Sequence, residues 1–236
     1  MGKNDLFTYK QFHIHQEHAA MKVGTDSDLL GTLSQGGDRI LDIGTGTGVL
    51  SLMLAQRYPQ AQLTAVEIDD NAVMDASINF RESPFAARIQ LVHASFQDFL
   101  LQESQERYDS VVCNPPYFDK SIESQDLGRT RARHTSSLPF SVLIGGAFNL
   151  LKDGGVFSVC IPPEVLDDFQ FQCQMNGFWL QDIYKIKSVP EKAPKRFVLV
   201  HCKGQVVTPR EHIFCMRNSD RSRSQWYQEL MQEFHL

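Results

Sequence analysis

Apolar and polar residues follow two different periods along this chain from residue 39 onward. Short, continuous apolar runs are typical of buried strands, and each is followed by a segment whose apolar residues recur at helical spacing. Strands are predicted at 39–43, 61–68, 88–93, 108–113 and 154–162, and helices at 49–58, 70–83, 96–104, 138–151 and 163–177. Strands that alternate with helices indicate a parallel sheet covered by helices on both faces.

The rhythm changes in the last quarter of the chain. Residues 179–189 and 196–204 both predict strands, and the short loop between them leaves no room for a helix, so the pair is expected to be antiparallel. Residues 212–217 are a candidate for one more strand, and residues 223–234 predict a final helix. The whole pattern predicts an α/β fold of the Rossmann-like type, with a mostly parallel, seven-stranded sheet and an antiparallel edge strand.

The segments outside the alternating pattern define the predicted domain organisation. Residues 1–38 form an N-terminal leader, in which residues 26–34 predict a short helix capped by Asp26. One domain spans residues 39–205. Residues 206–236 are a C-terminal extension, a strand plus a helix, that packs on the same domain. A chain of 236 residues suits one large domain with such appendages.

Composition narrows the class of protein. Apolar residues make up 42% of the chain, which is enough for a sizeable core. The start of the chain lacks the basic and apolar regions of a signal peptide, and no apolar run approaches the roughly 20 residues that span a bilayer. The five cysteines are widely spaced and include no C-x-x-C pair, which favours reduced core residues in a cytoplasmic protein that has no membrane partner.

Charge is distributed unevenly along the chain. The net charge of −5 argues weakly against nucleic acid as a partner. Residues 1–120 carry 9 Lys and Arg against 16 Asp and Glu, whereas residues 121–236 carry 14 against 12. The basic charge is therefore concentrated towards the C-terminal end.

A glycine-rich loop follows the first predicted strand. In "LDIGTGTGVL" (41–50), Gly44, Gly46 and Gly48 lie where an open α/β sheet binds its ligands, at the carboxyl ends of the strands. Glycines allow a ligand to approach the backbone, and the following helix offers unpaired N–H groups. The spacing is G-x-G-x-G, and Val49 stands where a dinucleotide-binding loop has its third glycine.

Two carboxylates indicate what this loop binds. Asp42 stands two residues before Gly44, where it would repel a pyrophosphate and attract a cationic amino group. Glu67 ends the second predicted strand, a place from which a carboxylate accepts the hydroxyls of a ribose. The expected ligand has a ribose and a positive end but no phosphate, and S-adenosyl-L-methionine fits this description. The alternative is a tight turn that Asp42 merely caps.

The segment "NPPYF" (114–118) ends the fourth predicted strand and is expected to face the same crevice. The rings of Pro115 and Pro116 fix the backbone and remove two N–H donors. The side-chain oxygen of Asn114 and the carbonyl of Pro115 can then act as two rigid acceptors, with the flat ring of Tyr117 beside them. Such a receptor suits a planar group that bears an –NH₂, such as adenine or a glutamine amide.

Two acceptors of this kind have a chemical use. The lone pair of an exocyclic amine is delocalised, and accepting both of its hydrogens returns the lone pair to nitrogen for attack on a methyl group. The positive charge that develops on nitrogen is then stabilised by the acceptor dipoles, and alignment of the reactants supplies much of the remaining rate. We therefore expect the catalytic residues to be Asn114, Pro115, Pro116 and Tyr117. The alternative is a rigid turn with an incidental aromatic.

The motifs "DIGTGTGVLSLMLA" and "NPPYF" resemble those of class I S-adenosylmethionine-dependent methyltransferases that modify exocyclic amines. The segments "FHIHQEHAAMKVGTDSDLLG" (12–31) and "RARHTSSL" (131–138) resemble, more narrowly, the bacterial tRNA1(Val) adenine-37 N6-methyltransferase family, over about residues 7 to 205. The resemblance implies a class I methyltransferase fold, S-adenosyl-L-methionine as the cofactor, and methyl transfer to the N6 amine of adenine in tRNA, with adenine 37 of tRNA1(Val) as the expected target.

The resemblance also implies a set of cofactor-binding residues, with the segment from Lys22 to Thr25 folded over the cofactor. Many relatives have an acidic residue after the third strand that accepts the amine of the cofactor adenine. Here Ser95 stands in that place and the nearest acid is Asp98, so that Ser95 could accept this bond or Phe96 could pack on the ring. The expected cofactor-binding residues are Lys22, Val23, Gly24, Thr25, Asp42, Gly44, Gly46, Gly48, Glu67, Ile68, Ser95, Phe96 and Asn114.

Basic residues in two regions are the candidates for phosphate contacts with the RNA. These candidates are Arg129, Arg131 and Arg133 after the NPPY motif, and Lys185, Lys187, Lys195 and Arg196 in the last strands. The leader histidines His13, His15 and His18 lack the spacing and partners of a zinc site, so we expect no metal. The expected oligomeric state is a monomer.

Two other functions stay open. Protein-glutamine N5-methyltransferases that act on release factors also carry NPPY, although they usually have a longer helical N-terminal domain than residues 1–38 could form. A catalytically silent RNA-binding protein of the same fold is the other alternative, but binding alone has no use for two acceptors aimed at an amine.

Overall fold

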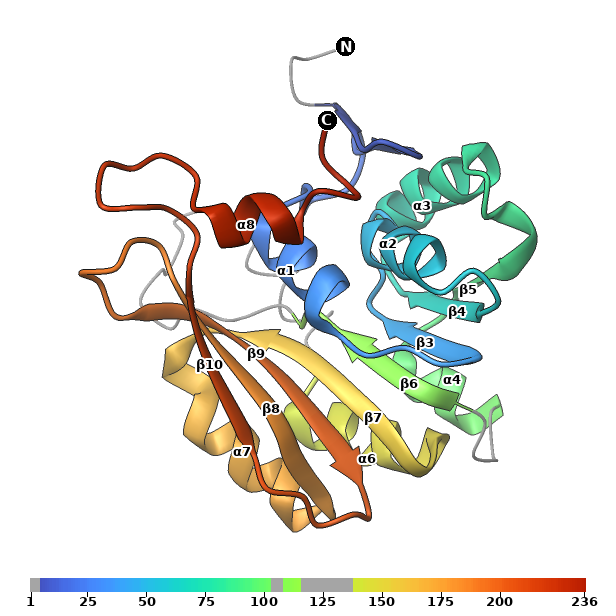
Figure 1. The fold of residues 1–236 in the computed structure, drawn as a ribbon. Coiled ribbons are helices and arrows are strands. Elements are labelled where there is room, and N and C mark those ends of the chain that lie inside the picture. The colour runs from blue at the N-terminus through green and yellow to red at the C-terminus, as the bar shows by residue number, and fades with distance from the viewer. Residues whose placement is uncertain (1–4, 103–107, 116–137) are drawn as a thin grey trace, which may run out of the picture.

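A central sheet of eight strands organises the fold (Figure 1), with the order β10-β8-β9-β7-β6-β3-β4-β5. The computed structural model describes residues 5–102, 108–115 and 138–236. The strands of this sheet are β3 (Arg39–Ile43), β4 (Gln62–Glu67), β5 (Ile89–His93), β6 (Tyr108–Cys113), β7 (Leu151–Ile161), β8 (Phe178–Lys187), β9 (Pro194–Lys203) and β10 (Arg210–Cys215).

The predicted α/β fold with a mostly parallel sheet is confirmed, with two differences in detail. Strand β10 forms in full and pairs parallel with β8, so the sheet has eight strands and not seven. The antiparallel strand is β9, which lies between β7 and β8 and not at the edge. Because β9 is antiparallel to both β7 and β8, strands β8 and β10 run in the same direction as β7, β6 and β3. Their carboxyl ends therefore reach the same edge of the sheet.

Helices and two apolar clusters cover the two faces of the sheet (Figure 1). Four helices and the leader pack on one face: α1 (Thr25–Leu33), α2 (Val49–Arg57), α3 (Asp70–Glu82) and α8 (Gln225–Leu230). The other face is covered by α4 (Phe96–Gln102), α6 (Phe140–Leu150) and α7 (Leu166–Met175). Two short 3₁₀ turns, η1 (Ala86–Arg88) and η2 (Pro163–Val165), complete the described elements.

The leader has structure that the sequence pattern did not predict. Strands β1 (Leu6–Thr8) and β2 (His13–His15) form an antiparallel hairpin before α1. The prediction that Asp26 caps the first helix is wrong. Gly24 is the N-cap and uses no side chain, whereas the Asp26 carboxylate accepts hydrogen bonds of 2.7 and 2.8 Å from Nε of Arg196 on β9. Asp26 lies inside the first turn, where it ties the helix to the sheet.

The interior agrees with the prediction for cysteines. All five are free thiols, and Cys113, Cys160, Cys173 and Cys202 are buried. Burial raises the pKa of the Cys113 and Cys160 thiols well above the usual value, so these two groups stay neutral and inert at physiological pH. Among the described residues no helix has both the length and the apolar character needed to cross a membrane.

Candidate active site

The site lies where the direction of strand succession reverses. From β3 the chain proceeds to β4 and β5 on one side, and β6 then pairs with the other side of β3. Ile43 lies opposite both Val66 and Cys113, so the residues that follow these three, Gly44, Glu67 and Asn114, lie side by side at the carboxyl edge. This reversal is the place where open α/β sheets bind ligands.

Glu67 is fixed against the glycine loop. Its Oε2 accepts a hydrogen bond of 2.8 Å from the backbone N–H of Gly46, and its Oε1 accepts bonds of 2.9 Å from the N–H groups of Ile68 and Asp69. The residue is only 9% exposed. A carboxylate has about four acceptor sites and three are used here, so Oε2 of Glu67 can accept one more hydrogen bond without moving.

The three loop glycines serve two different purposes. A Cβ atom at Gly44 or Gly46 would meet no described atom within 4 Å, and both residues have positive φ. By contrast, a Cβ atom at Gly48 would lie 2.4 Å from the ring of Phe80, at a φ of +83°. Gly48 is therefore required for packing against α3, whereas open space above Gly44 and Gly46 leaves room for a ligand.

Asp42 is a buried carboxylate with one oxygen unused. Its Oδ2 accepts hydrogen bonds from the hydroxyls of Thr45 (2.6 Å) and Ser51 (2.7 Å), while Oδ1 has no hydrogen-bond partner among the described residues. Burial raises the pKa of this carboxyl to about 6, and the two hydroxyl bonds oppose that shift. A buried, unpaired oxygen of this kind is costly unless a donor reaches it, and a cationic N–H group would satisfy it best.

Two side chains of α3 hold the leader against the glycine loop. Asn79 accepts a 2.7 Å bond from the N–H of His15 and donates bonds of 2.9 and 2.8 Å to the carbonyls of His15 and Thr47. Asp75 accepts bonds from the N–H groups of His18 (3.0 Å) and Ala19 (2.8 Å), and one of 2.8 Å from Nδ1 of His18. Both α3 side chains are buried.

Sequence reasoning missed Asp75 and Asn79. The available signal was a pair of polar residues, four positions apart, on a helix face that otherwise carries buried apolar side chains. The segment that they anchor leads directly to Lys22–Thr25. Within it, the N–H of Val23 donates to the Gln16 side chain at 2.7 Å, and Lys22 pairs with Asp5 at 3.0 Å.

Replacement of Asp75 by Ala is expected to release the leader while the sheet stays folded. The N–H groups of His18 and Ala19 would lose their acceptor, and each unsatisfied buried group costs about 1–3 kcal/mol. We expect faster amide hydrogen exchange at these two residues and faster tryptic cleavage at Lys22. Asp70→Ala, which removes an exposed carboxylate from the same helix, is the control. Unchanged exchange in the Asp75 variant would contradict the anchoring role.

The two residues after β5 that were predicted to contact the cofactor adenine have partners within the chain. Ser95 donates to Asp98 Oδ2 at 2.6 Å and accepts from the N–H of Asp98 at 3.0 Å, so its hydroxyl caps the start of α4. The ring of Phe96 is 5% exposed and packs against Gly146 in the core. Ile68, in contrast, is 44% exposed beside Glu67 and presents an apolar side chain at the edge of the site.

Several predicted site residues fall outside the described part of the chain. Asn114 and Pro115 are described, and they directly follow β6 beside Gly44. The residues outside the described ranges are Pro116, Tyr117, Arg129, Arg131 and Arg133.

Three of the four described basic candidates, and all three leader histidines, contact other side chains or backbone groups. Lys185 pairs with Glu211 at 2.6 Å, Arg196 pairs with Asp26, and Lys187 donates to the carbonyl of Pro190. Lys195 is exposed. The leader histidines do not share a partner, since His13 contacts Thr8, His15 contacts Glu82 and His18 contacts Asp75.

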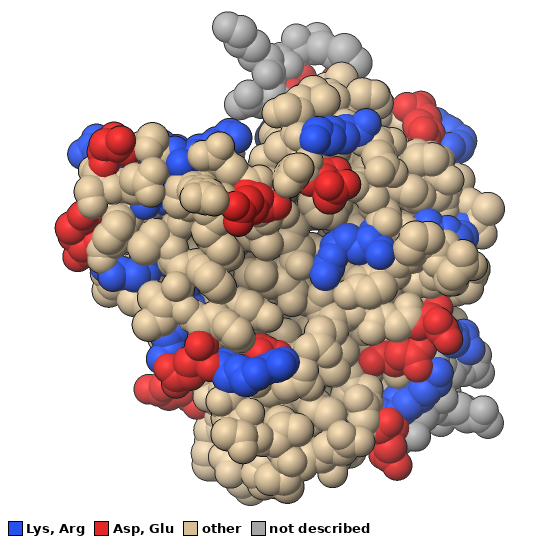
Figure 2. Space-filling view, in the orientation of Figure 1, with Lys and Arg blue, Asp and Glu red and all other residues tan. Residues whose placement is uncertain are grey.

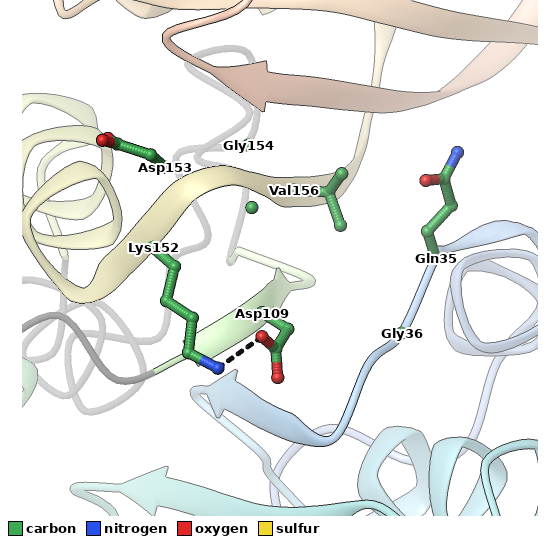
Figure 3. A pocket seen from close by; sticks show the side chains of 8 residues that line it. Gln35, Gly36, Asp109, Lys152, Asp153, Gly154 and Val156 are labelled. Atoms are coloured by element: carbon green, nitrogen blue, oxygen red, sulfur yellow. Dashed lines mark hydrogen bonds and ion pairs between the residues drawn. The ribbon is translucent and has the colours of Figure 1, made fainter.

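A hollow on the opposite edge of the sheet is not part of this site (Figure 3). It lies at the amino ends of β6 and β7 and is lined by residues that include Gln35, Asp109 and Lys152. Lys152 and Asp109 pair at 2.6 Å, and Asp109 also accepts the N–H of Arg39 at 2.8 Å. These contacts hold the amino ends of the strands together, far from Gly44 and Asn114.

Comparison of the sequence with known proteins shows to which family the chain belongs. The sequence profile of the methyltransferase small domain matches residues 18–161. A tRNA1(Val) (adenine(37)-N6)-methyltransferase from Bacteroides thetaiotaomicron is 38% identical over 236 residues, which cover 99% of this chain and 98% of that protein. The chain belongs to this methyltransferase family. The family member from Tolumonas auensis is likewise 38% identical, over 98% of this chain and 96% of its own length.

Solved structures of other methyltransferases share the fold of this family member. A structure described as a predicted O-methyltransferase from Agrobacterium tumefaciens has a TM-score of 0.68 at 21% identity and covers 89% of this chain and 96% of its own. A Thermus thermophilus 16S rRNA N2 G1207 methyltransferase, solved with AdoMet and guanosine, has a TM-score of 0.55 at 22% identity over 81% of this chain and 47% of its own. The expected class I methyltransferase fold is thereby confirmed.

Proposed function

We propose that this protein transfers the methyl group of S-adenosyl-L-methionine to the N6 amine of adenine 37 in tRNA1(Val). The observation that carries the proposal is the 38% identity with proteins of that name over 99% of the chain. The buried carboxylates at the reversal point, with Asn114 and Pro115 beside them, supply the chemistry that such a reaction needs.

The residues at the carboxyl edge fit this cofactor. When bound, S-adenosylmethionine supplies a methyl group carried on a positively charged sulfur. The unpaired Oδ1 of Asp42 suits its ammonium group, and Glu67 keeps one acceptor site for a ribose hydroxyl. We assign the exposed side chain of Ile68 to an apolar contact with the adenine ring, and the segment Lys22–Thr25, which follows the anchored Ala19, to the cover of the cofactor. Ser95 and Phe96, which cap α4 and pack in the core, are weaker candidates.

The target amine is assigned to the segment after β6. We assign the acceptance of its two hydrogens to the side-chain oxygen of Asn114 and the carbonyl of Pro115, which lie next to the glycine loop. These acceptors stabilise the positive charge that develops on nitrogen and orient the amine for transfer. Pro116 and Tyr117 keep the roles predicted from the sequence, a rigid turn and a stacking surface. Because the target base must be unstacked to reach such a segment, it should lie in a loop of the tRNA.

Methyl transfer from labelled cofactor distinguishes the proposed substrate from the alternatives. The enzyme is expected to label a tRNA1(Val) transcript, and not the same transcript with guanine at position 37 or a purified release factor. Labelling of the release factor alone would reverse the assignment, and labelling of none would favour a silent RNA-binding protein.

Replacement of Glu67 by Ala is expected to weaken cofactor binding by about 1.5–3 kcal/mol, the range for hydrogen bonds to a charged group. The variant also frees the N–H groups of Gly46 and Ile68, so its thermal stability must be measured in parallel. Calorimetric titration with S-adenosylmethionine measures the effect, with the exposed Glu229→Ala as control. An unchanged dissociation constant in a folded variant would remove Glu67 from the ribose contact.

Four further properties remain predictions from the sequence. They are the cytoplasmic location, the monomeric state, the absence of a metal, and the division into a leader (1–38), a catalytic domain (39–205) and a C-terminal extension (206–236). Among the four described basic candidates for RNA contact, Lys185 and Arg196 are engaged in ion pairs, whereas Lys195 is exposed.

A further inference from the structure

Two loops of the C-terminal region lie at the same edge of the sheet as the active site. One loop, residues 188–193, follows β8, and the other, residues 216–224, follows β10 (Figure 1). Because β8 and β10 run in the same direction as β3 and β6, these loops leave the sheet at the edge that holds Gly44 and Asn114. We call them the paired loops.

The paired loops form one rigid unit. The N–H groups of Met216 and Arg217 donate to the carbonyls of Lys187 (2.9 Å) and Ser188 (3.1 Å), which continues the pairing of β8 and β10 beyond the sheet. The second loop is a small hairpin, in which Arg217 and Arg223 form a bridge. Its end is fixed by Ser224, which caps α8 and donates to the carbonyl of Cys215 at 2.6 Å. The backbone positions that carry the cations of this unit are therefore fixed relative to one another.

Most positive charges on the paired loops, and on the strand residues that flank the first loop, have no acidic partner among the described residues. Residues 187–195 and 216–224 contain six cations and two acids, and both acids accept hydrogen bonds from serines, Glu191 from Ser219 and Asp220 from Ser222. No described residue forms an ion pair with the four cations Lys192, Lys195, Arg221 and Arg223. Figure 2 shows Lys and Arg side chains over this part of the molecule, at its upper left, with some acidic side chains among them.

Arg221 adds an independent observation. Its φ is +68°, and it is the one non-glycine residue in the described part of the chain with a positive φ. It occupies the turn in which its own N–H donates to the carbonyl of Asn218 at 2.9 Å. Glycine or asparagine adopts this left-handed conformation readily, whereas for arginine the same conformation strains the backbone. The carbonyl of Arg221 accepts a 3.0 Å bond from Arg217, but its guanidinium has no partner among the described residues, and a strained residue with an exposed charge points to a use for that charge.

We propose that the paired loops bind the phosphodiester backbone of the substrate RNA beside the target adenine, a proposal that rests on the proposed function. Guanidinium groups match phosphate oxygens with two parallel hydrogen bonds, and such contacts position an RNA without reading its sequence. The residues assigned to these contacts are Lys192, Arg217, Arg221 and Arg223 of the paired loops, together with Lys195 at the start of β9. Of these, only Lys195 was among the candidates from the sequence.

Arg221→Gly is the sharpest test because it separates folding from binding. Glycine relieves the backbone strain, so the melting temperature should stay the same or rise, while the affinity for a tRNA1(Val) transcript should fall. Each lost phosphate contact should lower the slope of log affinity against log salt by about 0.7 and weaken binding roughly fivefold near 0.1 M salt. A double variant, Lys192→Gln with Arg223→Gln, should show about twice the change in slope.

Fluorescence anisotropy at several salt concentrations, together with steady-state methylation, measures these effects. We expect the KM for tRNA to rise in both variants with little change in kcat, whereas Arg81→Gln, an exposed charge removed from α3, should change neither. If wild-type enzyme methylates the transcript but both variants keep its KM and salt slope, the surface is wrong and the proposed function stands. If the variants lower the salt slope but wild type transfers no methyl group to the transcript, the surface stands and the adenine-37 assignment fails.

Discussion

Replacement of Asn114 by Ala is expected to lower kcat about 100- to 1000-fold, the typical effect of removing one preorganised contact to a developing charge. The dissociation constant for S-adenosylmethionine should change little, because the lost interaction is strongest in the transition state. The motivation is its position, since Asn114 directly follows β6 and lies beside Gly44, where the site is open. Single-turnover methylation of the tRNA transcript measures the chemical step, and calorimetry measures the cofactor.

Two controls make the Asn114 result interpretable. Asn114 has interactions within the folded chain, so a melting curve must show that the Ala variant is folded. Asn176→Ala, at the end of α7 on the far side of the sheet, removes the same group from an exposed place and should leave kcat unchanged. If a folded Asn114→Ala enzyme kept more than about a tenth of the wild-type rate, the two-acceptor mechanism would be contradicted.

The sequence pattern predicted the central strands well because their signal is local. Strands β3 and β6 begin and end at the predicted residues, and α2 and α3 each end one residue early. The hairpin of β1 and β2 was not predicted, because three-residue strands show no alternation. The position of β9 was also missed, since the order of strands in a sheet is a long-range property that a local pattern does not contain.

The site was predictable to the extent that it lies at strand ends. Asp42, Glu67 and Asn114 could be assigned to one edge because parallel strands bring their carboxyl ends together. Asp75 and Asn79 could not, because they act on the backbone of a leader more than 50 residues away in the sequence. Likewise, Gly48 looks identical to Gly46 in the sequence, and only the ring of Phe80 shows that it serves packing.

Replacement of Asp42 by Asn is expected to weaken cofactor binding about 100-fold while removing a stability cost from the free enzyme. The negative charge of Asp42 attracts an ammonium group, but burial makes the same charge unfavourable in the free enzyme. A hydrogen bond to a charged group is worth about 1.5–3 kcal/mol. The pKa of Asp42 is raised from 3.8 to about 6 by burial, which corresponds to about 3 kcal/mol at neutral pH. The variant is thus expected to bind the cofactor less tightly and, at neutral pH, to lose the stability cost of a buried charge.

The pH dependence of unfolding provides the measurement. Between pH 4 and 6 the folded wild type keeps a proton on Asp42 that the unfolded chain has lost, so its stability falls as the pH rises through this window. His201 works in the opposite direction. Burial lowers its pKa to about 3, so stability falls as the pH drops below 6.5. The wild-type profile therefore contains two opposing slopes, and only the difference between variant and wild type isolates Asp42.

That difference is the quantity to test. The free energy of unfolding of Asp42→Asn minus that of the wild type should rise by roughly 2 kcal/mol as the pH increases from 4 to 7. A pH-independent cost, such as a buried amide N–H placed where Oδ1 was unpaired, shifts the whole difference curve but not its slope. Urea unfolding at several pH values in the absence of cofactor measures the curve. A flat difference would show that Asp42 is ionised as easily in the folded chain as in the unfolded one. It would contradict the conclusion that burial raises the pKa of Asp42 and that its carboxylate requires a cationic partner.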